Sequence, residues 1–176
     1  ICGNYDSTQI TMESGNIQNL IGGGIGYTPD NSSNVINTNI QMNGGTALSV
    51  QGGGMASGKI DGINYSVGNK DDAINSSNRT DIANIVISGG KITYGLFGGG
   101  QGYSYTGNVN LTISDGDLNG SYVTAGGSNG YTESANVKLT GGKISVYQTV
   151  NRGTLNNATI KVAGSSIDKF YVGGET

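Results

Sequence analysis

The chain has 176 residues, of which 33 are glycine and one is proline, and its formal net charge is -3 with 12% charged residues. An apolar content of 34% is low for a compact core with layered helices, and no block of Lys or Arg offers the positive surface that nucleic acid needs. We therefore exclude a nucleic-acid partner. Because the other polar residues are mostly Asn, Ser and Thr, we expect an ordered but thin fold rather than disorder.

The ends and the rare residues set further limits. No apolar run approaches the roughly 18–20 residues that a bilayer-spanning helix needs, so we expect no membrane insertion. The chain opens with ICGNYD, without a methionine or a signal peptide, and we expect residues 1–176 to be a single segment of a longer protein. One cysteine and no histidine exclude an internal disulfide and Ser–His or Cys–His nucleophile pairs.

One pattern of apolar residues recurs along the chain. The copies are QITMESGNI (9–17), NIQMNGGTA (39–47), NIVISGGKI (84–92), NLTISDGDL (110–118), NVKLTGGKI (136–144) and TIKVAGSSI (159–167). Their second, fourth and ninth residues are always apolar, and the third is polar in all but one copy, which is the alternation of a strand with one buried face. The small residues at the sixth and seventh positions predict a sharp bend, where glycine reaches positive φ.

A second apolar stretch follows most copies and runs into GGG or AGG, so each unit predicts a strand, a bend, a strand and a glycine corner. Gly90, Gly116 and Gly142 lie 26 residues apart. The longer interval before Gly90 contains GKIDGINYSVG (58–68), interpreted as an extra or degenerate coil, and a polar loop around residues 69–82. The sequence therefore predicts an all-β fold, a right-handed parallel β-helix (β-solenoid) of six to seven coils with no significant α-helix, its coils stacked about 4.8 Å apart.

Two sets of polar or aromatic residues recur at fixed places in the repeat. Residues Asn39, Asn84, Asn110 and Asn136 each open a copy, and we expect their side-chain amides to form a ladder from coil to coil. Residues Tyr27, Tyr103 and Tyr131 each follow a glycine at the glycine corner. These rings either stack and shield the backbone or form a ligand-binding face, on which a sugar would lie against the rings while amides bind its hydroxyls.

The acidic residues show no catalytic pattern. Asp71, Asp72 and Asp81 fall in the polar loop, while Asp115 and Asp117 flank a bend, and no column supplies the second carboxylate about 5–10 Å away that a glycosidase uses. We therefore expect no enzymatic activity, no metal site and no cofactor.

The recurring NVxLTGGKI and GGGxGY elements resemble the glycine-rich β-solenoid repeats of bacterial cell-surface adhesins, including the GGxI-type repeats of polymorphic outer-membrane proteins, and are similar to coils of phage fibres and tailspikes. This resemblance implies an extracellular rod on a cell or virion surface and carries over no catalytic residue. The resulting expectation is a non-enzymatic structural and binding module that contacts a glycan or protein receptor. A polysaccharide-acting lyase or hydrolase domain is the alternative, a passive spacer is a third reading, and homotrimer formation or end-to-end stacking stays open.

Overall fold

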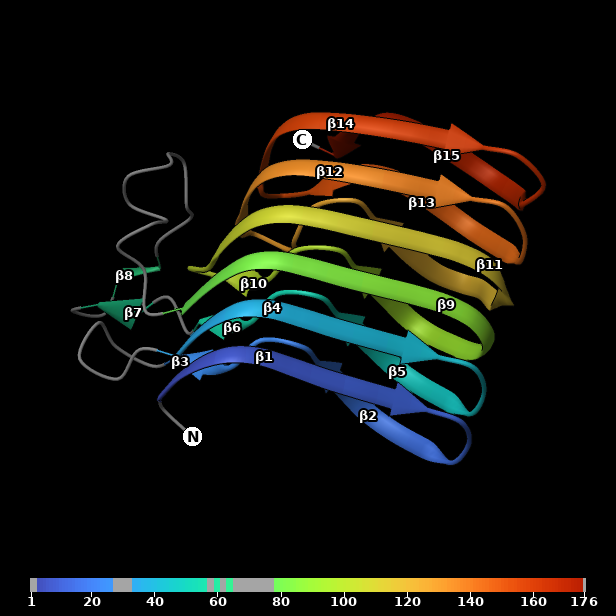
Figure 1. Cartoon of the computed structure of the whole chain (residues 1–176). Helices are drawn as coiled ribbons and strands as arrows, with labels where there is room; N and C mark the ends of the chain where they lie inside the picture. Colours follow the sequence, from blue (N-terminus) through green and yellow to red (C-terminus); the bar gives the residue numbers. More distant parts are fainter. Residues whose placement is uncertain (1–2, 27–32, 57–58, 61–62, 65–77, 176) are drawn as a thin grey trace.

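The structure is a computed structural model that describes residues 3–26, 33–56, 59–60, 63–64 and 78–175. Over these residues the chain is a parallel β-solenoid of about five turns, without α-helix (Figure 1). The all-β solenoid is thus confirmed, but the prediction of six to seven coils is too high. The predicted extra coil is absent from the stack over the described part of residues 58–68, because β7 (Lys59–Ile60) and β8 (Ile63–Asn64) pair antiparallel with each other in a separate sheet.

Each of two long sheets contains six strands, one from every pass of the chain, and about five turns separate the first pass from the last. The first sheet contains β1 (Gly3–Met12), β4 (Ser33–Met42), the first part of β9 (Asn78–Phe97), the first part of β11 (Tyr105–Thr124), β12 (Tyr131–Leu139) and β14 (Thr154–Val162). The second sheet contains β2 (Asn16–Ile21), β5 (Thr46–Gln51), the later parts of β9 and β11, β13 (Lys143–Asn151) and β15 (Ser166–Glu175). The short strands β3 (Ile25–Gly26), β6 (Met55–Ala56) and β10 (Gln101–Gly102) form a third side.

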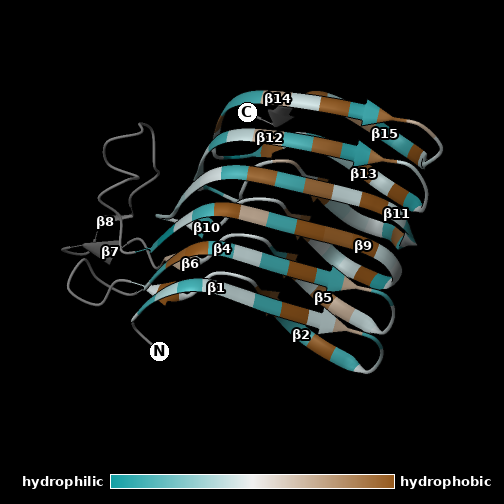
Figure 2. Cartoon of the chain, viewed as in Figure 1, coloured by the Kyte–Doolittle hydropathy of each residue, from teal (hydrophilic) through white to brown (hydrophobic). Residues whose placement is uncertain are grey.

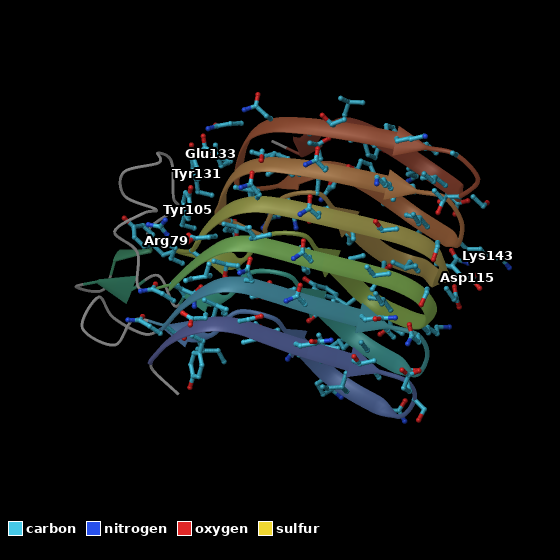
Figure 3. The ribbon with its side chains drawn as sticks, viewed as in Figure 1. Arg79, Tyr105, Asp115, Tyr131, Glu133 and Lys143 are labelled. Atoms are coloured by element: carbon cyan, nitrogen blue, oxygen red, sulfur yellow. The ribbon has the colours of Figure 1, made fainter. Side chains whose placement is uncertain are left out.

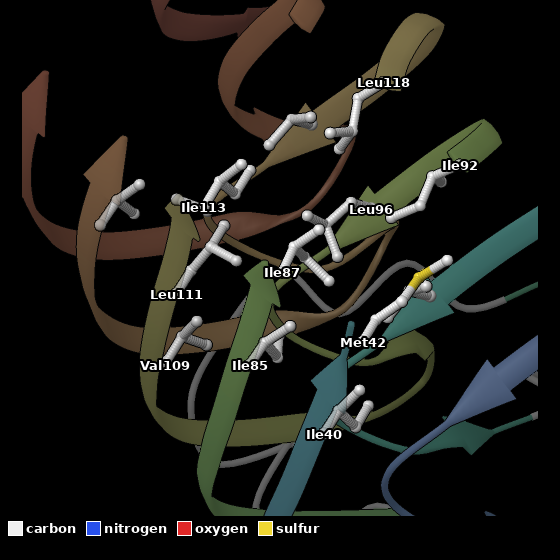
Figure 4. Close-up of a cluster of buried hydrophobic side chains, with 14 of the residues drawn as sticks. Ile40, Met42, Ile85, Ile87, Ile92, Leu96, Val109, Leu111, Ile113 and Leu118 are labelled. Carbon is white, nitrogen blue, oxygen red and sulfur yellow. The ribbon is translucent and has the colours of Figure 1, made fainter. Parts of the chain in front are cut away.

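The stacking brings equivalent residues of successive copies into register. Leu111 pairs with Ile85 on one side and with Val137 on the other, and all three side chains are buried. The apolar bands of neighbouring strands line up in Figure 2, and Figure 4 shows the resulting cluster between the two sheets. The alternation read from the sequence therefore sets the core, because the inward face of each strand is its apolar face.

The bend and the glycine corner use glycine for different reasons. At the bend, Gly90 has a φ of 85° and Gly142 a φ of 79°, a region that favours glycine. At the corner, the chain passes so close to its neighbours that a Cβ on Gly53 would lie 2.5 Å from the backbone nitrogen of Gly100. The hydroxyl of Thr38, on the first sheet, donates a hydrogen bond of 2.6 Å to the carbonyl oxygen of Gly52 at this corner. The glycine runs therefore let the third side pack directly on the first sheet.

The polar loop predicted around residues 69–82 is described only in part. Residues 69–77 lie outside the described residues, whereas residues 78–82 form the start of β9. Asn78 and Thr80 are fully buried there, and Arg79 is exposed.

Candidate ligand-binding groove

The asparagine column lies along the outer face of the first sheet. Asn84 donates a side-chain hydrogen bond of 3.0 Å to Asn39, and Asn110 donates one of 2.8 Å to Asn84. The contact from Asn136 to Asn110 is longer, at 3.5 Å. Each inner amide thus donates to one neighbour and accepts from the next, so the ladder joins the outer face of successive coils.

The predicted tyrosine column has a different register from the one expected. Tyr131 pairs with Tyr105 rather than with Tyr103, and the two rings stack with centroids 5.9 Å apart and an interplanar angle of 12°. Tyr103 is half-buried and packs against this pair, while Tyr27 lies outside the described residues. The guanidinium carbon of Arg79 lies 5.5 Å from the centroid of the Tyr105 ring, and Figure 3 shows these side chains beside one another where β9, β11 and β12 begin.

The stack leaves little ring surface open. Tyr131 is 4% exposed and Tyr105 is 8% exposed, and Asn156 donates a hydrogen bond of 2.5 Å to the Tyr131 hydroxyl. A sugar that stacks on an aromatic ring needs an exposed ring face. The geometry at Tyr103 and Tyr131 therefore favours the structural role, in which the rings shield one another and the backbone.

Exposed aromatic rings lie instead on the second sheet. Tyr94 is 58% exposed and Tyr122 is 43% exposed, and both border a groove of about 300 Å³. We call this hollow the aromatic–amide groove; its described lining is Tyr94, Phe97, Gln101, Tyr122, Ser128, Asn129, Gln148, Asn151 and Arg152. These residues come from three consecutive coils, so the groove exists only because the coils are stacked.

A glycine shapes the groove between its aromatic residues. Gly95 pairs with Tyr122 in the neighbouring coil, and a Cβ at Gly95 would lie 2.7 Å from atoms of the Phe97 ring. The missing side chain therefore makes room for Phe97, which is 4% exposed and whose ring centroid lies 6.4 Å from that of Tyr94 at an angle of 52°. Tyr94 and Tyr122 thus supply the exposed aromatic surface of the groove, and the buried Phe97 packs beside Tyr94.

The other side of the groove is polar and has unusual backbone geometry. Asn129 has a φ of 61° and Arg152 a φ of 54°, and these are the only non-glycine residues with positive φ in the part of the chain that the structure describes. The backbone N–H of Asn129 donates to the carbonyl oxygen of Asn151 at 3.1 Å, and Gln101 forms a bridge with Asn129. These contacts hold the amide-bearing turns of three consecutive coils side by side.

The described acidic residues that the sequence analysis named, Asp81, Asp115 and Asp117, do not line this groove. The backbone N–H of Asn119 donates to Asp117 at 3.1 Å and Lys91 Nζ lies 3.2 Å from the other oxygen, and these contacts, in that order, lower the pKa of the Asp117 carboxyl below its ordinary value. Asp115, at the same bend, accepts a hydrogen bond from the Gly116 N–H, and Asp81 pairs with Arg79 at 2.6 Å. Asp71 and Asp72 lie outside the described residues. Figure 3 shows Asp115 at the opposite end of the sheets from Arg79.

Within the described ranges, no three His, Cys, Asp or Glu side chains gather in a way that could hold a metal ion. The same ranges contain no helix long and apolar enough to span a bilayer.

Sequence reasoning overlooked the aromatic–amide groove because it followed the tyrosines of the glycine corner. The signal was present for Tyr122, which stands directly before the inward Val123, so alternation places it on the outer face. It was absent for Tyr94, which stands two residues before the inward Leu96, so alternation alone would place it inward. The correct tyrosine pair was also readable, since Tyr105 and Tyr131 each stand five residues before a ladder asparagine, Asn110 and Asn136.

The comparisons with known proteins add no relative: the chain matches no protein family, no curated protein and no solved structure.

Proposed function

We propose that the chain is a non-enzymatic structural and binding module of a bacterial cell-surface adhesin or a phage fibre, and that its aromatic–amide groove binds glycans. The observation that carries this proposal is the combination of exposed rings and accessible amides in one hollow, with Tyr94 and Tyr122 beside Asn129 and Asn151. The extracellular, cell-surface or virion-surface location is part of the proposal and is supported by the resemblance of the repeats.

The chemistry of a sugar fits this lining. A pyranose ring has an apolar face that packs on an aromatic ring, while its hydroxyl groups exchange hydrogen bonds with side-chain amides. The volume of about 300 Å³ is at the lower end for a small-ligand pocket and suits one or two sugar units better than a whole protein surface. Three stacked coils extend for about 10 Å along the solenoid axis, so a glycan chain could also run along the groove.

The solenoid supports this role by rigidity. A single coil buries too few side chains to be stable alone, so the ladder hydrogen bonds and the apolar columns between coils hold the groove in shape. A ligand that finds the rings and amides already placed loses less entropy on binding.

The alternative, a polysaccharide-acting domain, finds less support in the groove. A hydrolase of the usual kind needs two carboxylates across the scissile bond, and the described lining of the groove contains neither Asp nor Glu. A turnover assay on pectin-like and alginate-like polymers tests this alternative directly, and detection of product would contradict the non-enzymatic proposal.

The binding proposal is tested on a glycan array with three proteins. The wild type should bind a restricted set of glycans, and the Tyr94→Ala/Tyr122→Ala variant should lose that binding because it removes the exposed rings. Tyr5→Ala is the matched control, since Tyr5 is 46% exposed but lies on the first coil, outside the groove. If the double variant binds as the wild type does, the groove is not the glycan site. If no protein binds any glycan, the module acts as a spacer or binds another class of receptor.

A further inference from the structure

The aromatic–amide groove carries a single formal charge in its described lining, the guanidinium of Arg152. The other described lining residues are aromatic rings, amides and a serine. Arg152 follows Asn151, the last residue of β13, and its side chain is exposed. The electrostatic character of the groove is therefore set by one cation.

Arg152 has no ion-pair partner within the described part of the chain. Two described carboxylates pair with other cations: Asp81 pairs with Arg79, and Asp117 pairs with Lys91. An arginine presents several N–H donors in one plane, a geometry that matches the two oxygens of a carboxylate or sulfate. The groove thus offers an unused site for an anion beside aromatic rings.

The backbone conformation of Arg152 also supports a ligand site in the groove. Residues other than glycine, asparagine and aspartate rarely adopt a positive φ. Residues held in such a conformation cluster at ligand-binding sites. Both described non-glycine residues of this kind, Asn129 and Arg152, line the groove.

We propose that the ligand of the aromatic–amide groove is an acidic sugar, one that carries a carboxylate or a sulfate. Its anionic group pairs with Arg152, its ring lies against Tyr94 or Tyr122, and its hydroxyls bind the amides of Asn129 and Asn151. This inference rests on the proposed glycan-binding function and narrows it to a class of glycans. A neutral glycan would leave the cation unpaired and gain nothing from it.

The test uses matched pairs of glycans that differ only in charge. The pairs are oligogalacturonate and its methyl ester, a sialylated glycan and its desialylated form, and a sulfated glycan and its desulfated form. We expect the acidic member of at least one pair to bind at least about tenfold more tightly, as one charge-assisted pair would give. The pair whose acidic member binds more tightly shows whether the groove recognises a carboxylate or a sulfate. Binding of the acidic member should weaken when the salt concentration rises, because Arg152 is exposed and its charge is screened.

Two substitutions at Arg152 separate charge from shape. Arg152→Asn removes the charge but keeps a residue that tolerates positive φ, and should reduce the affinity for the acidic glycan about tenfold or more while leaving neutral glycans unchanged. Arg152→Lys should retain part of the affinity, because an ammonium group cannot form the two parallel hydrogen bonds. Lys138→Asn is the control, since it makes the same charge change on an exposed side chain of the first sheet.

The outcomes distinguish this inference from the function on which it depends. If glycans bind through Tyr94 and Tyr122 but neutral members bind as tightly as acidic ones, the acidic-sugar inference is wrong and the binding module stands. Unchanged affinity of Arg152→Asn for an acidic glycan also refutes it. If no glycan of any pair binds, both proposals fail.

Discussion

Replacement of Gly53 by alanine tests the close packing of the glycine corner on its neighbours. The added Cβ would lie 2.5 Å from the backbone nitrogen of Gly100, 2.6 Å from the hydroxyl oxygen of Thr106 and 2.8 Å from the Cα of Gly100. Two of these three atoms belong to the backbone of the next coil, so no side-chain rotation can relieve the clash. Overpacking of this kind costs about 1–3 kcal/mol, and we expect the free energy of unfolding to fall by about that amount.

Two further glycine variants isolate the steric effect. Gly126 lies in the glycine corner two coils further along, but a Cβ there would meet nothing nearer than 3.6 Å, so Gly126→Ala should change stability by less than about 1 kcal/mol. Gly120 has open space around it and a φ of 92°. Gly120→Ala should therefore cause no clash and should cost only about 1 kcal/mol of stability, because alanine disfavours a positive φ. Urea unfolding followed by the circular dichroism of the strands gives all three values. Equal stability of the Gly53 and Gly126 variants would refute the close approach of the corners.

Three other predictions concern the core, the ladder and the pH dependence. Leu111→Ala should destabilise the protein by about 2–5 kcal/mol in urea unfolding, because Leu111 is 1% exposed in the middle of an apolar column; a loss below about 1 kcal/mol would contradict the column. Asn84→Ala removes two ladder hydrogen bonds and should cost about 1–2 kcal/mol, more than Asn136→Ala, whose ladder contact is 3.5 Å long; the reverse order would argue against the ladder. Tyr147 is fully buried, its hydroxyl has no hydrogen-bond partner within the described residues, and burial raises the pKa of the phenol. Since only the unfolded state ionises readily, Tyr147 should lower stability as the pH rises above about 10, and Tyr147→Phe should unfold at a higher urea concentration than the wild type there, which a pH series of urea titrations measures.

Local patterns in the sequence were sufficient for the repeat. The alternation in segments such as NLTISDGDL identifies the inward face of a strand, and the small residues that follow identify the bend, because both depend only on side-chain period and on allowed φ. The interval of 26 residues between Gly90, Gly116 and Gly142 then predicts stacked coils. Where the interval lengthened, before Gly90, the same reasoning added a coil that the stack does not contain.

The register of the corners was harder to predict, because their lengths vary. The corner between Phe97 and Tyr105 is one residue longer than that between Thr124 and Tyr131, although both ends are paired from coil to coil. The apolar columns on either side of the corner fix the pairing of Tyr105 with Tyr131. An alignment based on the glycine that precedes each tyrosine instead places Tyr103 opposite Tyr131, which is wrong.

The sequence by itself determined the strands, the bends, the apolar columns and the asparagine ladder, since each follows from residues that recur at the same place in most of the units. The aromatic–amide groove was decided only by the tertiary structure. Tyr94, Tyr122 and Arg152 occupy different places in their own coils, and no repeat column relates them. They meet because stacking sets consecutive coils about 4.8 Å apart and because Gly95 leaves room for the Phe97 ring on the outer face of the second sheet.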